Sequence, residues 1–169
     1  MANYFEFFGL PLSPNVDQGA LKQTFYGNSK KFHPDFHTLS DQSVQDDVLE
    51  KSTLNNQGYK TLKDEDLRLK HFLDVHGALG PEGTNTVPQD FLMEIMDVNE
   101  ALMELEFEAD PLVRQKVTGL VDTLEHSLKA EVTDLLDGYD PDTSTPEQVD
   151  RLKNYYLKRR YLLRLRKKI

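Results

Sequence analysis

Apolar residues recur at helical spacing along most of the chain, and strand-like alternation is almost absent. In the first half this pattern predicts four helical segments, over residues 4–8, 16–32, 48–62 and 67–76. Asp17 is placed to cap the second of these segments. The His-Gly pair that follows the fourth segment is typical of a helix C-terminus.

The second half predicts three longer helices. Pro88 stands at a permitted N-terminal position, and an apolar stripe runs over residues 91–105. Asp110-Pro111 ends this helix and begins the next, whose apolar positions recur at spacings of three and four up to Gly138. Residues 145–148 (Thr-Pro-Glu-Gln) form a capping box that opens the last helix. Helices of about 20 residues are about 30 Å long, so we expect an elongated three-helix bundle.

Residues 77–90 separate the two halves. They contain three Gly and two Pro and have no apolar period, which marks a linker or a long turn. No internal repeat is present. The sequence therefore predicts an all-α protein of two modules, residues 1–76 and 88–169, joined by a linker over 77–87.

The composition narrows the function classes. The 169 residues suffice for one domain or two small ones, and the absence of Cys excludes disulfides, thiolate metal sites and cysteine nucleophiles. No basic leader with an apolar core is present, and no segment approaches the ~20 apolar residues that span a bilayer. We therefore expect a soluble, cytoplasmic protein without a membrane partner.

The net charge of −9 is unevenly distributed. Residues 1–80 carry a net −3, residues 81–145 a net −13 and residues 146–169 a net +7. An acidic middle and a basic end suggest that the last helix folds back on the middle of the chain. A basic tail that contacts nucleic acid is the alternative. We favour packing because the tail keeps an apolar period, so no nucleic-acid partner is predicted.

The tripeptide His33-Pro34-Asp35 lies between the second and third predicted helices. Pro34 lacks an N–H and restricts the residue before it, so His33 cannot continue the preceding helix. The tripeptide is therefore expected at an exposed tip, where a histidine and a carboxylate are suited to contacts. With His37 the same residues could be metal ligands of a small hydrolase. No further ligands accompany them, so neither a metal nor another cofactor is predicted.

A second candidate surface covers residues 91–104. Leu92, Met93 and Met96 widen the apolar stripe beyond one helix face, and methionines suit adaptable binding surfaces. Carboxylates follow on the same ridge and would favour a basic partner. The alternative is that the three apolar residues belong to the core. The ridge consists of Leu92, Met96, Asp97, Glu100 and Glu104.

The first module resembles a J-domain. Residues 4–10 (Tyr-Phe-Glu-Phe-Phe-Gly-Leu), 30–35 (Lys-Lys-Phe-His-Pro-Asp) and 54–62 (Leu-Asn-Asn-Gln-Gly-Tyr-Lys-Thr-Leu) follow one another in its order and at its spacing, and Arg68 fits too. The whole chain is similar to the HscB family of co-chaperones in iron–sulfur cluster assembly. Residues 7–11 (Phe-Phe-Gly-Leu-Pro) and 91–94 (Phe-Leu-Met-Glu) carry that narrower resemblance, with Glu100 and Glu104 following.

Three positions depart from the family pattern. Phe36 stands where Lys or Arg usually follows His-Pro-Asp, and Gly58 stands where Ala is usual. In the last helix Tyr155 or Tyr156 aligns with a Phe that the family shows on the bundle face.

The resemblance implies a co-chaperone that is not an enzyme. It would bind an IscU-type iron–sulfur scaffold protein, deliver it to a DnaK/HscA-type chaperone and stimulate that chaperone's ATPase through the His-Pro-Asp loop. The alternative is a J-domain co-chaperone with a different client, in which the bundle is a spacer or a dimerisation element; whether the chain forms a weak homo-oligomer stays open. The implied chaperone-binding residues are Lys22, Lys30, Lys31, His33, Pro34 and Asp35, and the implied scaffold-binding residues are Leu92, Met93, Met96, Asp97, Glu100, Glu104 and Tyr155.

Overall fold

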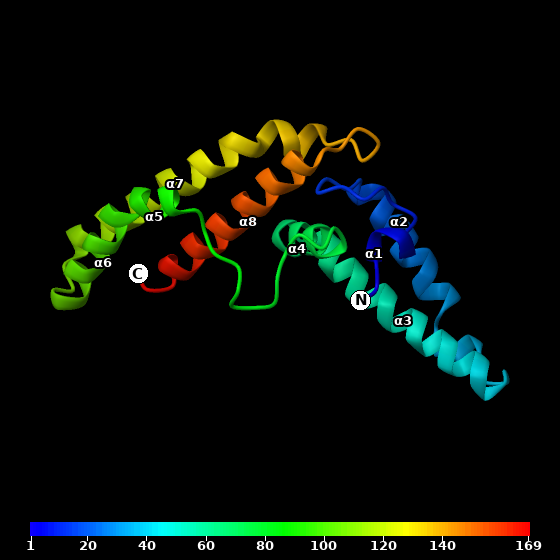
Figure 1. Cartoon of the computed structure of the whole chain (residues 1–169). Helices are drawn as coiled ribbons and strands as arrows, with labels where there is room; N and C mark the ends of the chain where they lie inside the picture. Colours follow the sequence, from blue (N-terminus) through cyan, green and yellow to red (C-terminus); the bar gives the residue numbers. More distant parts are fainter. The chain divides into compact units, whose positions relative to one another are not determined.

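The computed structural model describes all 169 residues, and every regular element in it is a helix (Figure 1). The predicted all-α class is therefore confirmed. The chain divides into two compact units, Met1–Val75 with Tyr139–Thr143, and His76–Gly138 with Ser144–Ile169. The predicted domain bounds, 1–76 and 88–169 with a linker over 77–87, stay a prediction. None of the helices is long and apolar enough to cross a membrane.

The first unit is built around a helical hairpin. Helices α2 and α3 lie side by side and are joined at one end by a loop that contains a single 3₁₀ turn (Figure 1). The core between the helices is formed by Phe5, Leu21, Leu62, Phe72 and Leu73, all fully buried. The elements are α1 (Tyr4–Phe7), α2 (Gln18–Lys31), η1 (Pro34–Phe36), α3 (Gln42–Lys63) and α4 (Glu65–Val75).

The helix ends follow local rules that the sequence already indicates. The Asp17 side chain accepts a hydrogen bond from the Ala20 N–H at 3.1 Å and caps α2, as predicted. The Asp64 side chain does the same for the Leu67 N–H at 2.9 Å at the start of α4. After α4, Gly77 adopts a φ of 66°, which glycine accepts without a steric cost.

A buried histidine, His71, joins α4 to α1. Its Nε2 accepts a hydrogen bond from the Tyr4 N–H at 3.0 Å, and its ring stacks on the Tyr4 ring at 4.6 Å between centroids. Burial lowers the pKa of His71 below its ordinary value of 6.5. The folded protein therefore holds this histidine neutral, with the lone pair of Nε2 committed to the backbone of α1.

We expect this histidine to make the first unit sensitive to acid. Below about pH 6.5 the unfolded chain binds a proton at residue 71 more readily than the folded chain, because the folded pKa is the lower one. The free energy of unfolding therefore decreases as the pH falls from 6.5 towards the pKa of His71 in the folded protein. Denaturant unfolding of the protein and of His71→Gln at neutral and mildly acidic pH measures the effect. The expectation is contradicted if the two proteins lose stability with falling pH in the same way. Burial lowers the pKa of His76 as well, but His76 is present in both proteins and cannot cause a difference between them.

The second unit is a bundle whose first helix is divided. The sequence predicts one helix after Pro88, but the structure divides it at Ile95, where φ is −92° and ψ is 3°. The hydrogen bonds from the Ile95 N–H to Phe91 O and from the Asn99 N–H to Ile95 O, 3.1 and 3.0 Å long, continue the helical ladder across the break. The elements are α5 (Gln89–Glu94), α6 (Met96–Phe107), α7 (Pro111–Gly138) and α8 (Pro146–Arg166).

Helix α7 is the central helix of this bundle, because both α6 and α8 pack against it. Its 28 residues make it about 42 Å long. The predicted capping box opens α8: the Thr145 hydroxyl accepts from the Gln148 N–H at 3.3 Å and the Gln148 side chain accepts from the Thr145 N–H at 3.2 Å. The fully buried core residues include Phe91, Ile95, Val117, Val121, Leu152 and Leu162.

The basic end of the chain folds back on the acidic middle, as predicted. Arg166 on α8 lies 2.7 Å from Asp122 and 2.8 Å from Glu125 of α7. Arg151 pairs with Asp134 at 3.4 Å, further along the same two helices. Exposed ion pairs each contribute less than about 1 kcal/mol, so apolar packing provides most of the stability and the charges help to set the alignment of α8.

Candidate functional site

The His33-Pro34-Asp35 loop leaves α2 where the sequence predicts. His33 adopts an extended conformation, with φ of −74° and ψ of 128°, and Pro34 begins the 3₁₀ turn η1. His33 Nδ1 accepts a hydrogen bond from the Asp35 N–H at 3.2 Å. The neutral ring therefore carries its proton on Nε2, which is available as a donor. The side chains of His33 and Asp35 are 51% and 84% exposed, so both are accessible to a partner.

The loop is fixed by its own hydrogen bonds. The N–H groups of Phe36 and His37 donate to the carbonyls of His33 and Pro34, at 3.1 and 3.0 Å. The Gln45 side chain donates to two further loop carbonyls at 3.2 and 3.0 Å. An ordered loop loses less conformational entropy when it binds, which favours its use as a contact surface.

The structure does not join His33, Asp35 and His37 into a ligand set. His37 Nε2 is instead 3.0 Å from the carbonyl oxygen of Lys31, which ties the loop to the end of α2. No group of three or more His, Asp or Glu side chains is placed to hold a metal ion anywhere in the chain.

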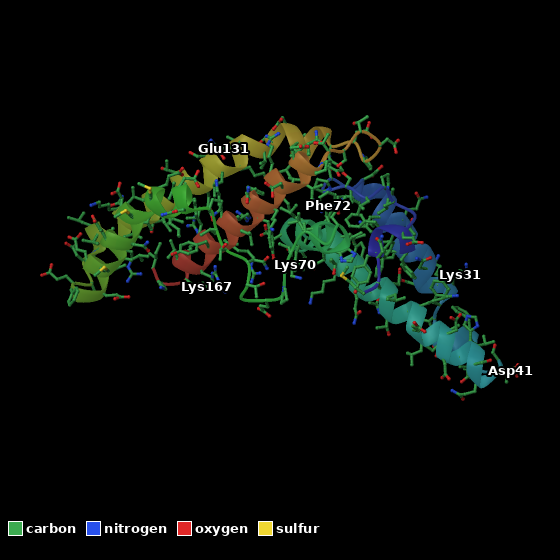
Figure 2. The ribbon with its side chains drawn as sticks, viewed as in Figure 1. Lys31, Asp41, Lys70, Phe72, Glu131 and Lys167 are labelled. Atoms are coloured by element: carbon green, nitrogen blue, oxygen red, sulfur yellow. The ribbon has the colours of Figure 1, made fainter.

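Three lysines of α2 extend this surface with positive charge. Lys22, Lys30 and Lys31 are exposed, and none of them forms an ion pair within the chain. The Lys31 ammonium lies 5.3 Å from the centre of the Phe32 ring, next to the loop. Figure 2 labels Lys31 on α2 and Asp41 at the far end of the hairpin. Helix α2 therefore presents three uncompensated ammonium groups, and Lys30 and Lys31 stand at the end of α2 that adjoins the His-Pro-Asp loop.

Exposed apolar side chains at the same tip were missed by the sequence analysis. Phe36 is 73% exposed and lies edge-on to the His33 ring, with 5.9 Å between centroids. Leu39 and Leu49 are also exposed, and Leu49 borders a hollow of about 280 Å³ together with Pro34 and Asp35. Leu49 stands next to the buried Val48 at the start of the predicted segment 48–62, so the sequence contained no signal that set it apart from the core.

The second predicted surface lies on α5 and the start of α6. Leu92, Met93 and Met96 are 40, 67 and 55% exposed, whereas the neighbouring Phe91 and Ile95 are fully buried. Truncating exposed side chains usually changes the free energy of unfolding by no more than about 0.5 kcal/mol. The three residues therefore form an apolar patch outside the core, and we call them the methionine patch.

Carboxylates continue from the methionine patch along α6. Asp97, Glu100 and Glu104 are exposed, and none of them pairs with a basic side chain of the chain. Their spacing of three and four places them on one side of the helix. The structure thus brings together six of the seven predicted scaffold-binding residues on one continuous surface of α5 and α6.

The structure does not bring Tyr155, the seventh residue, to this surface. Tyr155 is only 6% exposed and lines a hollow of about 160 Å³ with Leu128 and Val132 of α7. Tyr156 is buried as well, and its hydroxyl accepts a hydrogen bond from Arg160 at 3.3 Å. Both tyrosines are interior because α8 turns that side towards the bundle, which a single sequence does not reveal.

The aromatic residue of α8 that adjoins the methionine patch is Tyr161. Its ring lies edge-on to Phe91 of α5, with 6.0 Å between centroids, and it shares a cleft of about 530 Å³ with Leu92. Leu157, Arg160 and Arg164 line the same cleft. The spacing of 157, 161 and 164 would have indicated a common face of α8, but only the fold shows which helix this face meets.

Known proteins share sequence and fold with this chain. Residues 87–169 match a family described as the HSCB C-terminal oligomerisation domain. The chain is 38% identical over 105 residues to the co-chaperone protein HscB of Buchnera aphidicola, which covers 62% of this chain and 60% of that protein. It is 30% identical over 134 residues to the co-chaperone protein HscB homolog of Chromobacterium violaceum, which covers 79% of this chain and 71% of that protein.

Two solved structures share the fold. The crystal structure of human co-chaperone protein HscB superposes with a TM-score of 0.72 at 26% identity, covering 99% of this chain and 80% of that one. The chaperone HscB from Vibrio cholerae superposes with a TM-score of 0.58 at 25% identity, covering 98% of both chains.

Proposed function

The chain belongs to the HscB family of co-chaperones, and we propose that it binds an IscU-type iron–sulfur scaffold protein and delivers it to a DnaK/HscA-type chaperone. The same proposal makes the His-Pro-Asp loop the element that stimulates the chaperone's ATPase. The matched region spans about 60% of the Buchnera relative. The proposed partners and activity therefore rest on the properties of the two surfaces of this chain.

The hairpin surface is suited to an ATPase domain that offers an arginine and acidic groups. Asp35 can accept a charge-assisted hydrogen bond from an arginine, and the Nε2–H of His33 can donate to a carbonyl or carboxylate. The unpaired ammonium groups of Lys22, Lys30 and Lys31 would attract acidic groups around that contact. Binding that is stronger to the hydrolysis-competent conformation shifts the chaperone towards it. The phosphoryl chemistry then belongs to the chaperone, and this chain acts as a trigger.

The methionine patch is suited to a protein client. Three exposed apolar side chains form its centre, and the unpaired carboxylates of Asp97, Glu100 and Glu104 form its rim. An interface of this kind derives its affinity from the apolar centre and its selectivity from the charged rim. A scaffold protein with a basic apolar surface would match both parts.

The observation that carries the proposal is that one chain exposes two unrelated contact surfaces. One is an ordered His-Pro-Asp loop flanked by unpaired lysines, and the other is an apolar patch flanked by unpaired carboxylates. They belong to different compact units of the chain. A protein with two such surfaces can hold a client and a chaperone at the same time, which is what delivery requires.

The acidic rim provides a test of the client surface. The triple substitution Asp97→Asn, Glu100→Gln and Glu104→Gln removes three charges without shortening the side chains. We expect the affinity for an IscU-type scaffold, measured by isothermal titration calorimetry, to fall about tenfold at low salt. The reason is that each lost ion pair with the scaffold would cost about a few tenths of a kcal/mol or more. The salt dependence of binding should weaken as well.

The matched control removes three exposed carboxylates of the bundle outside the rim, with Glu106→Gln, Glu131→Gln and Asp137→Asn. This control should bind the scaffold as the unaltered chain does. Equal affinity of both triple variants would contradict an acidic rim that faces the scaffold.

A second candidate role is self-association, in which the bundle serves as a dimerisation element for a J-domain protein with another client. Met103, Phe107 and Leu112 are exposed near the turn between α6 and α7, and the matching family model describes an oligomerisation domain. Analytical ultracentrifugation over a range of concentrations distinguishes the roles. A stable dimer that Phe107→Ser dissociates would favour this second role.

A further inference from the structure

Helix α8 carries two kinds of arginine. Arg151, Arg159 and Arg166 are paired with carboxylates of α7. Arg160 and Arg164 take part in no ion pair: the only hydrogen bond of the Arg160 guanidinium goes to the Tyr156 hydroxyl, at 3.3 Å. Both guanidinium groups are exposed, so their charges are available to a partner.

Aromatic rings hold these two arginines in place. The Arg160 guanidinium lies 5.6 Å from the centre of the Tyr156 ring, and the Arg164 guanidinium lies 5.6 Å from the centre of the Tyr161 ring. A cation–π contact of this kind favours one position of the side chain and leaves guanidinium N–H groups available as donors. The two arginines are therefore ordered donors, and they differ in this respect from Lys167 and Lys168 at the end of α8.

Both arginines line a cleft of about 530 Å³. One wall is α8, with Leu157 and Tyr161 beside the arginines, and the opposite wall is the segment 82–87 that precedes α5. Leu92 of the methionine patch lines the cleft too. Glu82 is the single acidic residue among the lining residues, so the two arginines give the cleft a positive charge.

The wall formed by residues 82–87 is fixed by local hydrogen bonds. The Asn85 side chain accepts from the Gly80 N–H at 2.8 Å and donates to the Gly80 carbonyl at 3.0 Å. The Thr84 hydroxyl donates to the Pro81 carbonyl at 2.7 Å. Part of the segment that the sequence indicates as a linker is thus tied into a compact turn, and the cleft has two defined sides.

We propose that this cleft receives an acidic segment of the scaffold protein that binds the methionine patch. The proposal rests on the proposed client function and adds a second contact to it. Carboxylates match the planar donor edge of a guanidinium, and the floor formed by Leu92 and Leu157 accommodates the apolar part of Asp or Glu side chains. Because Leu92 belongs to both the patch and the cleft, one partner can cover the two continuously.

The charges on the two sides of the patch would fix the orientation of the scaffold. Asp97, Glu100 and Glu104 form an acidic rim on α6, whereas Arg160 and Arg164 form a basic rim on α8. A partner with a basic and an acidic segment fits in one orientation, and the reversed orientation brings like charges together. The cleft would therefore fix the orientation of the scaffold on the helical bundle.

The test compares two double variants of the 169-residue chain. Arg160→Gln with Arg164→Gln removes both cleft charges, and Lys167→Gln with Lys168→Gln removes two charges at the C-terminal end of α8, where Figure 2 labels Lys167. Affinity for an IscU-type scaffold is measured by calorimetry at low and high salt. We expect about a tenfold loss for the arginine variant at low salt, little loss at high salt and no loss for the lysine variant.

A charge-conserving variant, Arg160→Lys with Arg164→Lys, separates net charge from guanidinium geometry and should lose affinity only a few-fold. If the unaltered chain binds the scaffold and the folded Arg→Gln variant binds equally well, the cleft proposal is wrong and the client function stands. If the unaltered chain does not bind the scaffold, both proposals are overturned. A third outcome would assign the cleft to nucleic acid instead. In that case the unaltered chain binds a single-stranded oligonucleotide, and the Arg→Gln variant loses this binding while its affinity for the scaffold is unchanged.

Discussion

Replacing His33 with Gln is expected to abolish the stimulation of a DnaK/HscA-type ATPase while the fold is retained. In the loop, His33 Nδ1 accepts the Asp35 N–H and the rigid ring directs the Nε2–H outwards. Gln offers a donor and an acceptor as well, but on a flexible chain that cannot hold both positions at once. A lost hydrogen bond to a charged group costs about 1.5–3 kcal/mol, so stimulation should fall at least tenfold.

His126→Gln is the matched control, because it makes the same substitution at an exposed histidine of α7. Steady-state ATP hydrolysis by the chaperone is measured at increasing concentrations of each protein. Circular dichroism should show unchanged helix content for both variants, since the His33 side chain is half exposed. Stimulation by His33→Gln equal to that of the unaltered chain would contradict the assignment of the loop as the trigger.

Substituting the methionine patch with Leu92→Ser, Met93→Ser and Met96→Ser is expected to remove most of the affinity for the scaffold. Each of the three side chains would be buried on binding, and apolar anchors in an interface each contribute about 1 kcal/mol or more. Their joint loss corresponds to a Kd about 100-fold higher. The free energy of unfolding should change little, because all three side chains are exposed.

Leu67→Ser provides the control, because Leu67 of α4 lies outside the patch and is about as exposed as Leu92. Calorimetry gives the affinity of each variant, and thermal unfolding gives its stability. A triple variant that unfolds would mean that the patch belongs to the core. A folded triple variant with unchanged affinity would mean that the scaffold binds elsewhere or not at all.

Some elements could be predicted from the sequence because their causes are local. Pro34 ends α2 through steric restriction of His33, and Thr145 with Gln148 opens α8 through a capping box. The fold-back of the basic helix also followed from the sequence, because opposite net charges on two segments favour their packing. In these cases the structure depends on neighbouring residues or on the net charge of a segment, and both can be read from the sequence.

Other features depend on which side of a helix meets its neighbour. Tyr155 fits the apolar period of α8, but the period does not tell an interior face from one that borders the methionine patch. Gly58 is similar: an added Cβ would lie 2.7 Å from the Phe8 ring, a close approach of α1 to α3 that no local pattern indicates. The cleft at Arg160 and Arg164 depends on the path of residues 82–87, a segment without a period.

Delivery itself is tested most directly by ATP hydrolysis of the chaperone with scaffold and co-chaperone added separately and together. We expect the combination to stimulate hydrolysis by more than the sum of the two separate effects, because this chain would hold both partners. The methionine-patch variant should retain stimulation through the loop of His33 and lose the additional effect of the scaffold. If the unaltered chain stimulates hydrolysis equally with and without scaffold, it does not deliver the scaffold to the chaperone.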